Sequence, residues 1–396
     1  MAVTLNVTSV PAVTVWLCGD AVIVGGTPTT MRRAMLRWFT GWPLLAACVA
    51  PGAANAATAP APFREVEVCF VLDTTGSMAN LIKAARDKIW FIANEIVSAP
   101  SRPAVKLCLL GFRDRGDAYV TRHTKLTPDV DRIYAELAQF QAEGGGDTPE
   151  AVNQALSEAI DASGWSPRDE VLKLIFLVGD APPKVYAGEP QYPELAARAA
   201  ARGIVINPVL CGEDDQARRT WDTIAILARG RGAAIGDASR VERIVTPMDQ
   251  DLAALNQRIG RTLVPYGSEA VRAETAAKQK SAEGMDDIGV SDRLAFNAAT
   301  GRTVQGGGDL IDALDRGELA TTAIDRDRLP DGLRSMTETE LLAALQARRD
   351  ERVALRRVID ALVVERREYI KARRKGGAQG FDAVVADTIR VQLQRR

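Results

Sequence analysis

The stretch FVLDTTGSM, residues 70–78, decides how this chain folds. Its first three residues end an apolar run, residues 66–72, that has the length and composition of a buried β-strand. Asp73, Thr75 and Ser77 then place one carboxylate and two hydroxyls directly behind the strand, where a helical pattern begins. Because ligands of parallel α/β sheets gather at the carboxyl ends of the strands, these oxygen donors predict an ion site.

Strand-like and helix-like patterns alternate from residue 65 to residue 265. We predict strands at 66–72, 105–112, 118–124, 171–178, 204–210 and 232–235, and helices at 81–97, 130–142, 149–162, 192–202, 216–228 and 250–263. The run 171–178 is apolar almost throughout, as expected where both faces of a parallel sheet are covered. The alternation predicts an α/β, Rossmann-like fold with a doubly wound, mostly parallel sheet flanked by helices.

The rest of the chain divides into segments with different composition. We expect a linker with a small mixed segment at 266–336 and a helical C-terminal region at 337–396, with helices at 338–374 and 381–393. The longer helix has near-heptad spacing that suggests a coiled coil. Arg348, Arg352 and Arg366 interrupt its apolar seam, so the pattern does not favour a regular one.

Residues 1–56 are predicted to hold an upstream extension followed by an export signal. A basic segment begins at Met31, an apolar segment follows, and small residues ending at Ala56 are typical of a cleavage site. Export signals begin at the initiator, so we expect Met31 or Met35 to be the true start. The residues before it are then untranslated sequence or a disordered extension.

Two refinements of this signal stay open. The residues before Cys48 resemble a bacterial lipobox, which would attach an acyl chain to that cysteine, and residues 32–37 loosely resemble a twin-arginine signal. Residues 57–64 are predicted to be a linker. We therefore expect an exported protein, periplasmic or associated with the envelope, that is soluble after cleavage near Ala56 or anchored by a lipid at Cys48.

Composition limits the classes of function. The chain has 396 residues, 46% of them hydrophobic, and a formal net charge of −1, so a nucleic-acid partner is not expected. Cys69, Cys108 and Cys211 fall in predicted strands and are interpreted as buried thiols, not as a disulfide framework. His123, the only histidine, is expected on an exposed edge strand. No set of nucleophile and base is present, so the sequence does not favour an enzyme.

Three segments place oxygen donors at predicted strand ends. Asp73, Thr75 and Ser77 follow the first strand, Thr148 lies in a glycine-rich loop before a helix, and Asp180 follows the apolar strand 171–178. Carboxylates and hydroxyls suit a small hard cation. Each segment also has an ordinary interpretation, because Ser77 or Thr148 would suit a helix cap and Asp180 a turn.

With these residues, the chain resembles a von Willebrand factor A domain with a metal-ion-dependent adhesion site. The resemblance covers roughly residues 65–265, and the segments FVLDTTGSM, GFRDRGD, GGGDTPE and LVGDAPP further resemble a bacterial exported subfamily. It implies a divalent cation, Mg²⁺ with Mn²⁺ or Ca²⁺ as alternatives, held by Asp73, Thr75, Ser77, Thr148 and Asp180. It also implies that an acidic group of a protein partner completes the coordination.

The expected function is therefore a cation-dependent protein-binding or scaffold module of the bacterial envelope, without enzymatic activity. Asp147 beside Thr148 leaves open which of the two faces the ion. One alternative is a metal-assisted hydrolase with Asp114 or Glu150 as the base. Another is a structural role carried by the C-terminal helices.

Overall fold

The structure is a computed structural model that describes residues 2–4, 14–18, 21–24, 62–145, 149–235, 243–373 and 380–394. The chain divides into two compact units, Met1–Thr58 and Ala59–Arg396. The start codon, Cys48 and the cleavage site near Ala56 lie outside the described residues. Among the residues described, none of the helices is both long enough and apolar enough to cross a membrane.

In the first unit, short strands form an antiparallel sheet that the sequence analysis did not predict. Its strands are β1 (Ala2–Thr4), β2 (Thr14–Cys18) and β3 (Ala21–Val24), in the order β1-β2-β3.

The second unit is built on a six-stranded sheet in the order β6-β5-β4-β7-β8-β9. The strands are β4 (Glu65–Asp73), β5 (Ala104–Phe112), β6 (Thr121–Thr127), β7 (Val171–Gly179), β8 (Ile204–Cys211) and β9 (Ala233–Ile235). Edge strand β6 runs antiparallel to β5, and the other pairs are parallel. The predicted mostly parallel sheet is confirmed.

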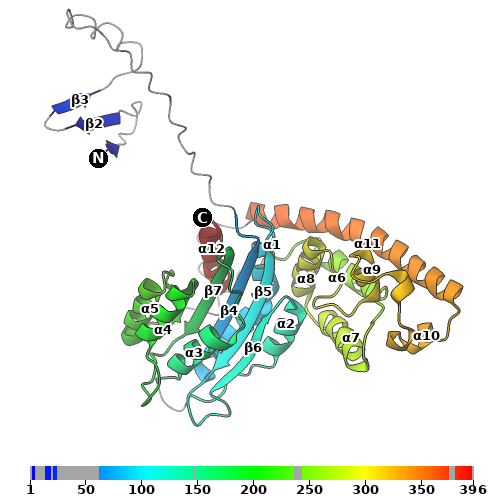
Figure 1. The fold of residues 1–396 in the computed structure, drawn as a ribbon, viewed down its shortest axis with the longest axis horizontal. Coiled ribbons are helices and arrows are strands. Elements are labelled where there is room, and N and C mark those ends of the chain that lie inside the picture. The colour runs from blue at the N-terminus through cyan, green and yellow to red at the C-terminus, as the bar shows by residue number, and fades with distance from the viewer. Residues whose placement is uncertain are drawn as a thin grey trace, which may run out of the picture. The chain divides into compact units, whose positions relative to one another are not determined.

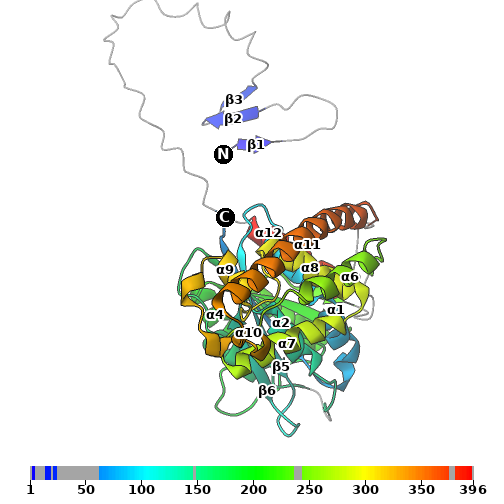
Figure 2. The ribbon, with the colours of Figure 1, turned by 90° about the vertical axis from the view of Figure 1, so that its right-hand side faces the viewer.

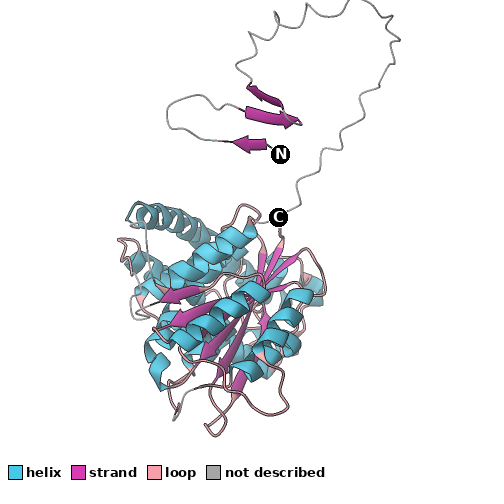
Figure 3. Ribbon diagram, turned by 90° about the vertical axis from the view of Figure 1, so that its left-hand side faces the viewer, coloured by secondary structure: helices cyan, strands magenta, loops and turns pink. Residues whose placement is uncertain are grey.

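Helices cover both faces of this sheet (Figure 3). On one face α1 (Ala79–Val97), α2 (Val130–Ala138) and α12 (Phe381–Leu393) pack against side chains such as Val68, Phe70 and Phe176. On the other face α3 (Val152–Ala162), α4 (Tyr192–Ala201) and α5 (Asp215–Leu227) pack against side chains such as Val71 and Leu110. The doubly wound arrangement explains why β7 is buried along its whole length.

Between β9 and α12 the chain forms a helical extension, residues 249–373 (Figure 1). It contains α6 (Asp249–Gly260), α7 (Glu269–Glu283), α8 (Asp287–Thr300), α9 (Leu310–Asp315), α10 (Asp331–Arg334) and α11 (Glu338–Arg373), with 3₁₀ turns η2 (Thr321–Ala323) and η3 (Arg326–Arg328). The predicted helical C-terminal region is confirmed. The domain boundaries themselves stay a prediction.

The long helix α11 packs against α6 and α8 of its own chain (Figure 2). Two of the three arginines that interrupt its apolar seam, Arg352 and Arg366, form buried ion pairs. Arg352, with none of its side chain exposed, contacts Asp309 and lies 2.9 Å from Asp312. Arg366 binds Asp249 at 2.7 Å and Asp292 at 2.6 Å.

Further buried ion pairs join the helical extension to helix α2, which covers one face of the six-stranded sheet. Arg293 of α8 donates two hydrogen bonds to Asp131 of α2, at 2.7 and 3.1 Å. Lys278 of α7 lies 2.5 Å from Asp129, which caps α2. These pairs give α7 and α8 a fixed position on α2.

The cysteine interpretation is wrong for two of the three residues. Cys69 of β4 and Cys108 of β5 form a disulfide, and Cys211 is a buried free cysteine. Parallel pairing of β4 and β5 places Cys69 directly opposite Cys108. The two cysteines are 39 residues apart in sequence, so local sequence does not predict the strand register that brings them together.

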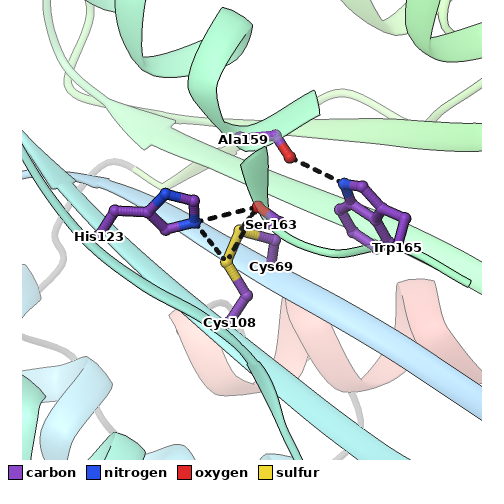
Figure 4. Close-up of a disulfide and its surroundings, with 6 residues drawn as sticks. All are labelled: Cys69, Cys108, His123, Ala159, Ser163 and Trp165. Carbon is purple, nitrogen blue, oxygen red and sulfur yellow. Dashed lines mark hydrogen bonds between the residues drawn. A yellow bond between two sulfur atoms is a disulfide. The ribbon is translucent and has the colours of Figure 1, made fainter. Parts of the chain in front are cut away.

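His123 is also less exposed than predicted. Figure 4 shows its ring beside the disulfide, with Nε2 3.1 Å from Ser163 Oγ and 3.5 Å from Cys108 Sγ. Burial lowers the pKa of His123 below its ordinary value. This histidine is therefore part of the packing between β6 and the end of α3.

Candidate functional site

The end of β4 forms a compact turn of polar side chains. Asp73 Oδ1 accepts hydrogen bonds from the backbone N–H of Thr75 at 2.9 Å and from its hydroxyl at 2.6 Å. The hydroxyls of Thr75 and Ser77 lie 3.4 Å apart. Asp73 and Thr75 are buried, whereas Ser77 is exposed. The structure thus brings together the three donors predicted from residues 70–78.

The second oxygen of Asp73 is left without a partner. Oδ2 is buried and accepts no hydrogen bond from the described residues. Burial raises the pKa of Asp73 to about 7, with Asp180 raising it further and the Thr75 hydrogen bonds and Arg113 opposing the shift. A Cβ added to Gly179 would lie 3.4 Å from Oδ2, so this oxygen faces the carboxyl end of β7, where Asp180 follows.

A glycine turn brings the loop before α3 over this site. Gly144 and Gly145 have φ of 82° and 79°, which side chains other than glycine rarely adopt. Gly144 O accepts a hydrogen bond from Gly76 N at 3.3 Å, and Asp117 Oδ2 accepts one from Gly145 N at 3.4 Å. Asp117 therefore borders the site.

Glu150, which the sequence analysis named only as a possible base of a hydrolase, belongs to the same loop. Its side chain is buried, and Oε2 has no hydrogen-bond partner among the described residues. Burial raises the pKa of Glu150 to about 8, and the carboxylates of Asp73, Asp114, Asp117 and Asp180 add to the shift. No pattern in the sequence shows that this side chain would be buried beside four other acids.

Unlike Glu150, Asp114 has hydrogen-bond partners on both of its carboxylate oxygens. Lys184 lies 2.6 Å from its Oδ2, and the Tyr186 hydroxyl donates to Oδ1. The pKa of Asp114 is lowered, because these hydrogen bonds outweigh the opposing effect of burial. An ion-paired carboxylate of low pKa is a poor general base, which weighs against Asp114 in a hydrolase mechanism.

The helix-cap interpretations fail where they can be examined. Helix α1 has Met78 as its N-cap, α3 has Ala151, and neither N-cap makes a side-chain cap hydrogen bond. Helix α3 begins at Val152, later than predicted, because Glu150 pairs with Pro183 in an isolated β-bridge. Ser77 therefore caps no helix. Thr148 and Asp147 lie outside the described residues, so the choice between them stays a prediction.

Within the part of the chain that the structure describes, the acidic side chains alone do not make up a metal-holding group. Over the described ranges, which omit 146–148, no three or more His, Cys, Asp and Glu side chains form a metal-holding group. The donor set instead combines one orphaned carboxylate oxygen with two hydroxyls, which suits a hard cation that keeps part of its water shell. The described residues therefore fit a cation that some of the carboxylates would contact through bound water molecules.

Comparison with known proteins gives matches in the sheet unit. A family model described as "von Willebrand factor A domain" matches residues 67–231. Von Willebrand factor A domain-containing protein 7 of Rattus norvegicus and that of Homo sapiens are each 36% identical over 115 residues, 29% of this chain and 12% of the relative. The chain thus spans about an eighth of the length of these curated relatives.

Solved structures match over 43% to 44% of this chain. The SpRpn10 VWA domain has a TM-score of 0.34 at 14% identity, covering 43% of this chain and 88% of the other. Proximal thread matrix protein 1 from the mussel byssus has a TM-score of 0.34 at 14% identity, covering 44% and 42%. A structure of that mussel protein with a zinc-occupied MIDAS motif has a TM-score of 0.32 at 16% identity, covering 43% and 41%.

Proposed function

Because residues 67–231 form a von Willebrand factor A domain, we propose that the chain is a divalent-cation-dependent protein-binding module. The cation, Mg²⁺ or in its place Mn²⁺ or Ca²⁺, would lie at the carboxyl ends of β4 and β7. The observation that carries the proposal is the buried Asp73 Oδ2, which has no partner among the described residues and faces the position where Asp180 follows β7. A buried carboxylate oxygen without a partner is costly unless an ion or water compensates it.

The proposed ligand set is that of the sequence analysis, namely Asp73, Thr75, Ser77, Thr148 and Asp180. The turn at Thr75 holds two hydroxyls 3.4 Å apart, and Asp73 Oδ1 orients the Thr75 hydroxyl. When bound, the cation supplies a Lewis-acidic position for an anionic oxygen. Ser77 is exposed, so solvent or a partner can reach this turn. A carboxylate of a partner protein would occupy the Lewis-acidic position.

The proposed compartment is the bacterial envelope, after export. The Cys69–Cys108 disulfide supports this part, because disulfides form and persist in oxidising compartments. The protein would be periplasmic after cleavage near Ala56 or anchored by a lipid on Cys48. Mass spectrometry of the protein purified from membranes would distinguish an acylated Cys48 from a mature chain that begins after Ala56.

Calorimetric titration of the full chain with MgCl₂ and MnCl₂ tests the cation site. We expect the wild type to bind and Asp73→Ala to lose binding. Asp251→Ala is the matched control, because Asp251 is an exposed aspartate of α6, far in sequence from the proposed ligands. Absence of binding to the wild type would contradict the proposed function. Unchanged binding to Asp73→Ala would contradict the position of the site.

A pull-down from envelope extract tests the partner. Capture by the wild type should be lost with a chelator and with Asp180→Ala, and retained by Asp251→Ala. A phosphatase and esterase screen with and without chelator addresses the hydrolase alternative. Reproducible cation-dependent turnover would favour that alternative over a binding module.

A further inference from the structure

We infer that Glu150 is a further acidic group of the cation site, whose carboxylate contributes to holding the ion. The inference rests on the proposed cation binding and deepens it, since Glu150 lies outside the ligand set given above. It concerns one side chain of the loop before α3 and can fail while the cation site itself stands.

The backbone of Glu150 is fixed between two segments. Its N–H donates to Pro182 O at 3.1 Å, and its carbonyl accepts from Lys184 N at 2.7 Å. This bridge joins the loop before α3 to the loop that follows β7 and carries Asp180. The position of the Glu150 side chain is therefore set by the same two loops that border the site.

The side chain points toward the turn at the end of β4. A Cβ added to Gly145 would lie 3.0 Å from Thr75 Cβ and 3.6 Å from Glu150 Oε1. Both side chains thus approach the same glycine, Thr75 from the turn after β4 and Glu150 from the loop before α3. Glycine at this position leaves room for the Glu150 carboxylate beside a residue that carries a proposed ligand hydroxyl.

The strongest charges that act on Glu150 are those of other acids. The side chain is 2% exposed, and Oε2 has no hydrogen-bond partner among the described residues. Of the acids that act on it, Asp114 is paired with Lys184, which leaves Asp73, Asp117 and Asp180 as the acidic neighbours. A buried carboxylate among like charges destabilises the fold unless a positive group compensates it. A bound divalent cation would supply that charge.

A purely structural role for Glu150 predicts the opposite effect on the protein without cation. If the carboxylate supported the fold, Glu150→Gln would lower the melting temperature in EDTA. If it serves the cation, the same substitution removes an uncompensated charge and raises that temperature. The sign of the change separates the two roles.

The experiment compares the wild type, Glu150→Gln, Glu150→Asp and the control Glu143→Gln, which makes the same change at an exposed position of the same loop. Affinity for Mg²⁺ and Mn²⁺ is measured by calorimetry, and the melting temperature is measured in EDTA. We expect Glu150→Gln to bind roughly 10- to 100-fold more weakly, as for groups that tune a metal site from outside its direct ligands. It should also melt at a higher temperature in EDTA.

Glu150→Asp keeps the charge and should bind more tightly than Glu150→Gln, and Glu143→Gln should match the wild type in both measurements. Affinity of Glu150→Gln within about twofold of the wild type would overturn the inference, as would a lower melting temperature in EDTA. A wild type that binds neither ion would instead contradict the proposed function.

Discussion

At the carboxyl ends of β4 and β7, Asp73 and Glu150 each keep a buried oxygen that has no hydrogen-bond partner among the described residues. In the helical extension, by contrast, Asp309 and Asp312 share the guanidinium of Arg352. Both regions bury carboxylates, but they compensate the charge differently. The extension uses arginines of its own chain, which keeps the helices together at all times. At the sheet edge, the proposed cation would supply the compensating charge. The difference between the two regions teaches that a buried carboxylate oxygen is a candidate ligand where no side chain of the described residues pairs with it.

The largest effect should come from removing the arginine that compensates two acids. Arg352→Met would leave Asp309 buried without its arginine, while Asp312 keeps Arg356 at 2.6 Å. We expect a cost of about 3–5 kcal/mol in the free energy of unfolding. Urea unfolding of this variant measures the loss. Arg357→Met changes an exposed arginine of the same helix and should stay within about 0.5 kcal/mol of the wild type. A small loss of unfolding free energy for Arg352→Met would show that the stability of the helical extension does not depend on this arginine.

A slightly smaller effect should follow at the contact between the extension and the sheet unit. Arg293→Met removes two hydrogen bonds to Asp131, and we expect a loss of about 3 kcal/mol, since Gln305 N still donates to that carboxylate at 2.9 Å. Thermal unfolding followed by two probes, one for each region, would measure it. A single unchanged transition would contradict the role of this pair.

At the sheet edge the comparison predicts stabilisation by an ion from outside. In saturating Mg²⁺, at about 100 times the dissociation constant, the wild type should gain about 2.7 kcal/mol over the protein in EDTA. Asp180→Asn should show little of this gain, because it removes a proposed ligand charge. Differential scanning calorimetry with and without Mg²⁺ gives both values. An equal gain in the variant would remove Asp180 from the site.

The smallest effect is expected at the exposed rim. Arg115 lies 2.8 Å from Glu189 and stacks over the ring of Tyr186, with 44% of its side chain exposed. Arg115→Met should cost less than about 1 kcal/mol, because solvent and salt weaken exposed ion pairs. Urea unfolding at low and high salt tests this. If Arg115→Met lost as much unfolding free energy as Arg352→Met, the expectation that exposed ion pairs stabilise the fold less than buried ones would be wrong.

Much of the fold followed from local patterns. Residues 66–72 and 171–178 predict buried strands by apolarity alone, and β4 and β7 lie there. Boundaries were less predictable where tertiary contacts decide them. Helix α3 begins at Val152 because Glu150 is drawn into a bridge with Pro183, a contact that local sequence does not encode.

The residues of the candidate site also divide into those that local sequence predicts and those that only the fold brings together. Asp73, Thr75 and Ser77 were predictable as a group, because five consecutive residues place them in one turn behind a strand. The burial of Glu150 and the place of Asp117 beside Gly145 were not, because each depends on loops from separate strands meeting at one edge. The disulfide was missed for the same reason, since the register of β4 against β5 decides it.

By itself, the sequence determined the alternation of strands and helices and the turn at residues 70–78 that begins the site. Hydrophobic periodicity and short spacings between residues are local properties, so they can be interpreted before the fold is known. Only the tertiary structure decided which buried acids are compensated. That outcome depends on whether a distant arginine, such as Arg352 for Asp309, reaches the carboxylate. At Asp73 Oδ2 and Glu150 Oε2, no side chain of the described residues donates a hydrogen bond.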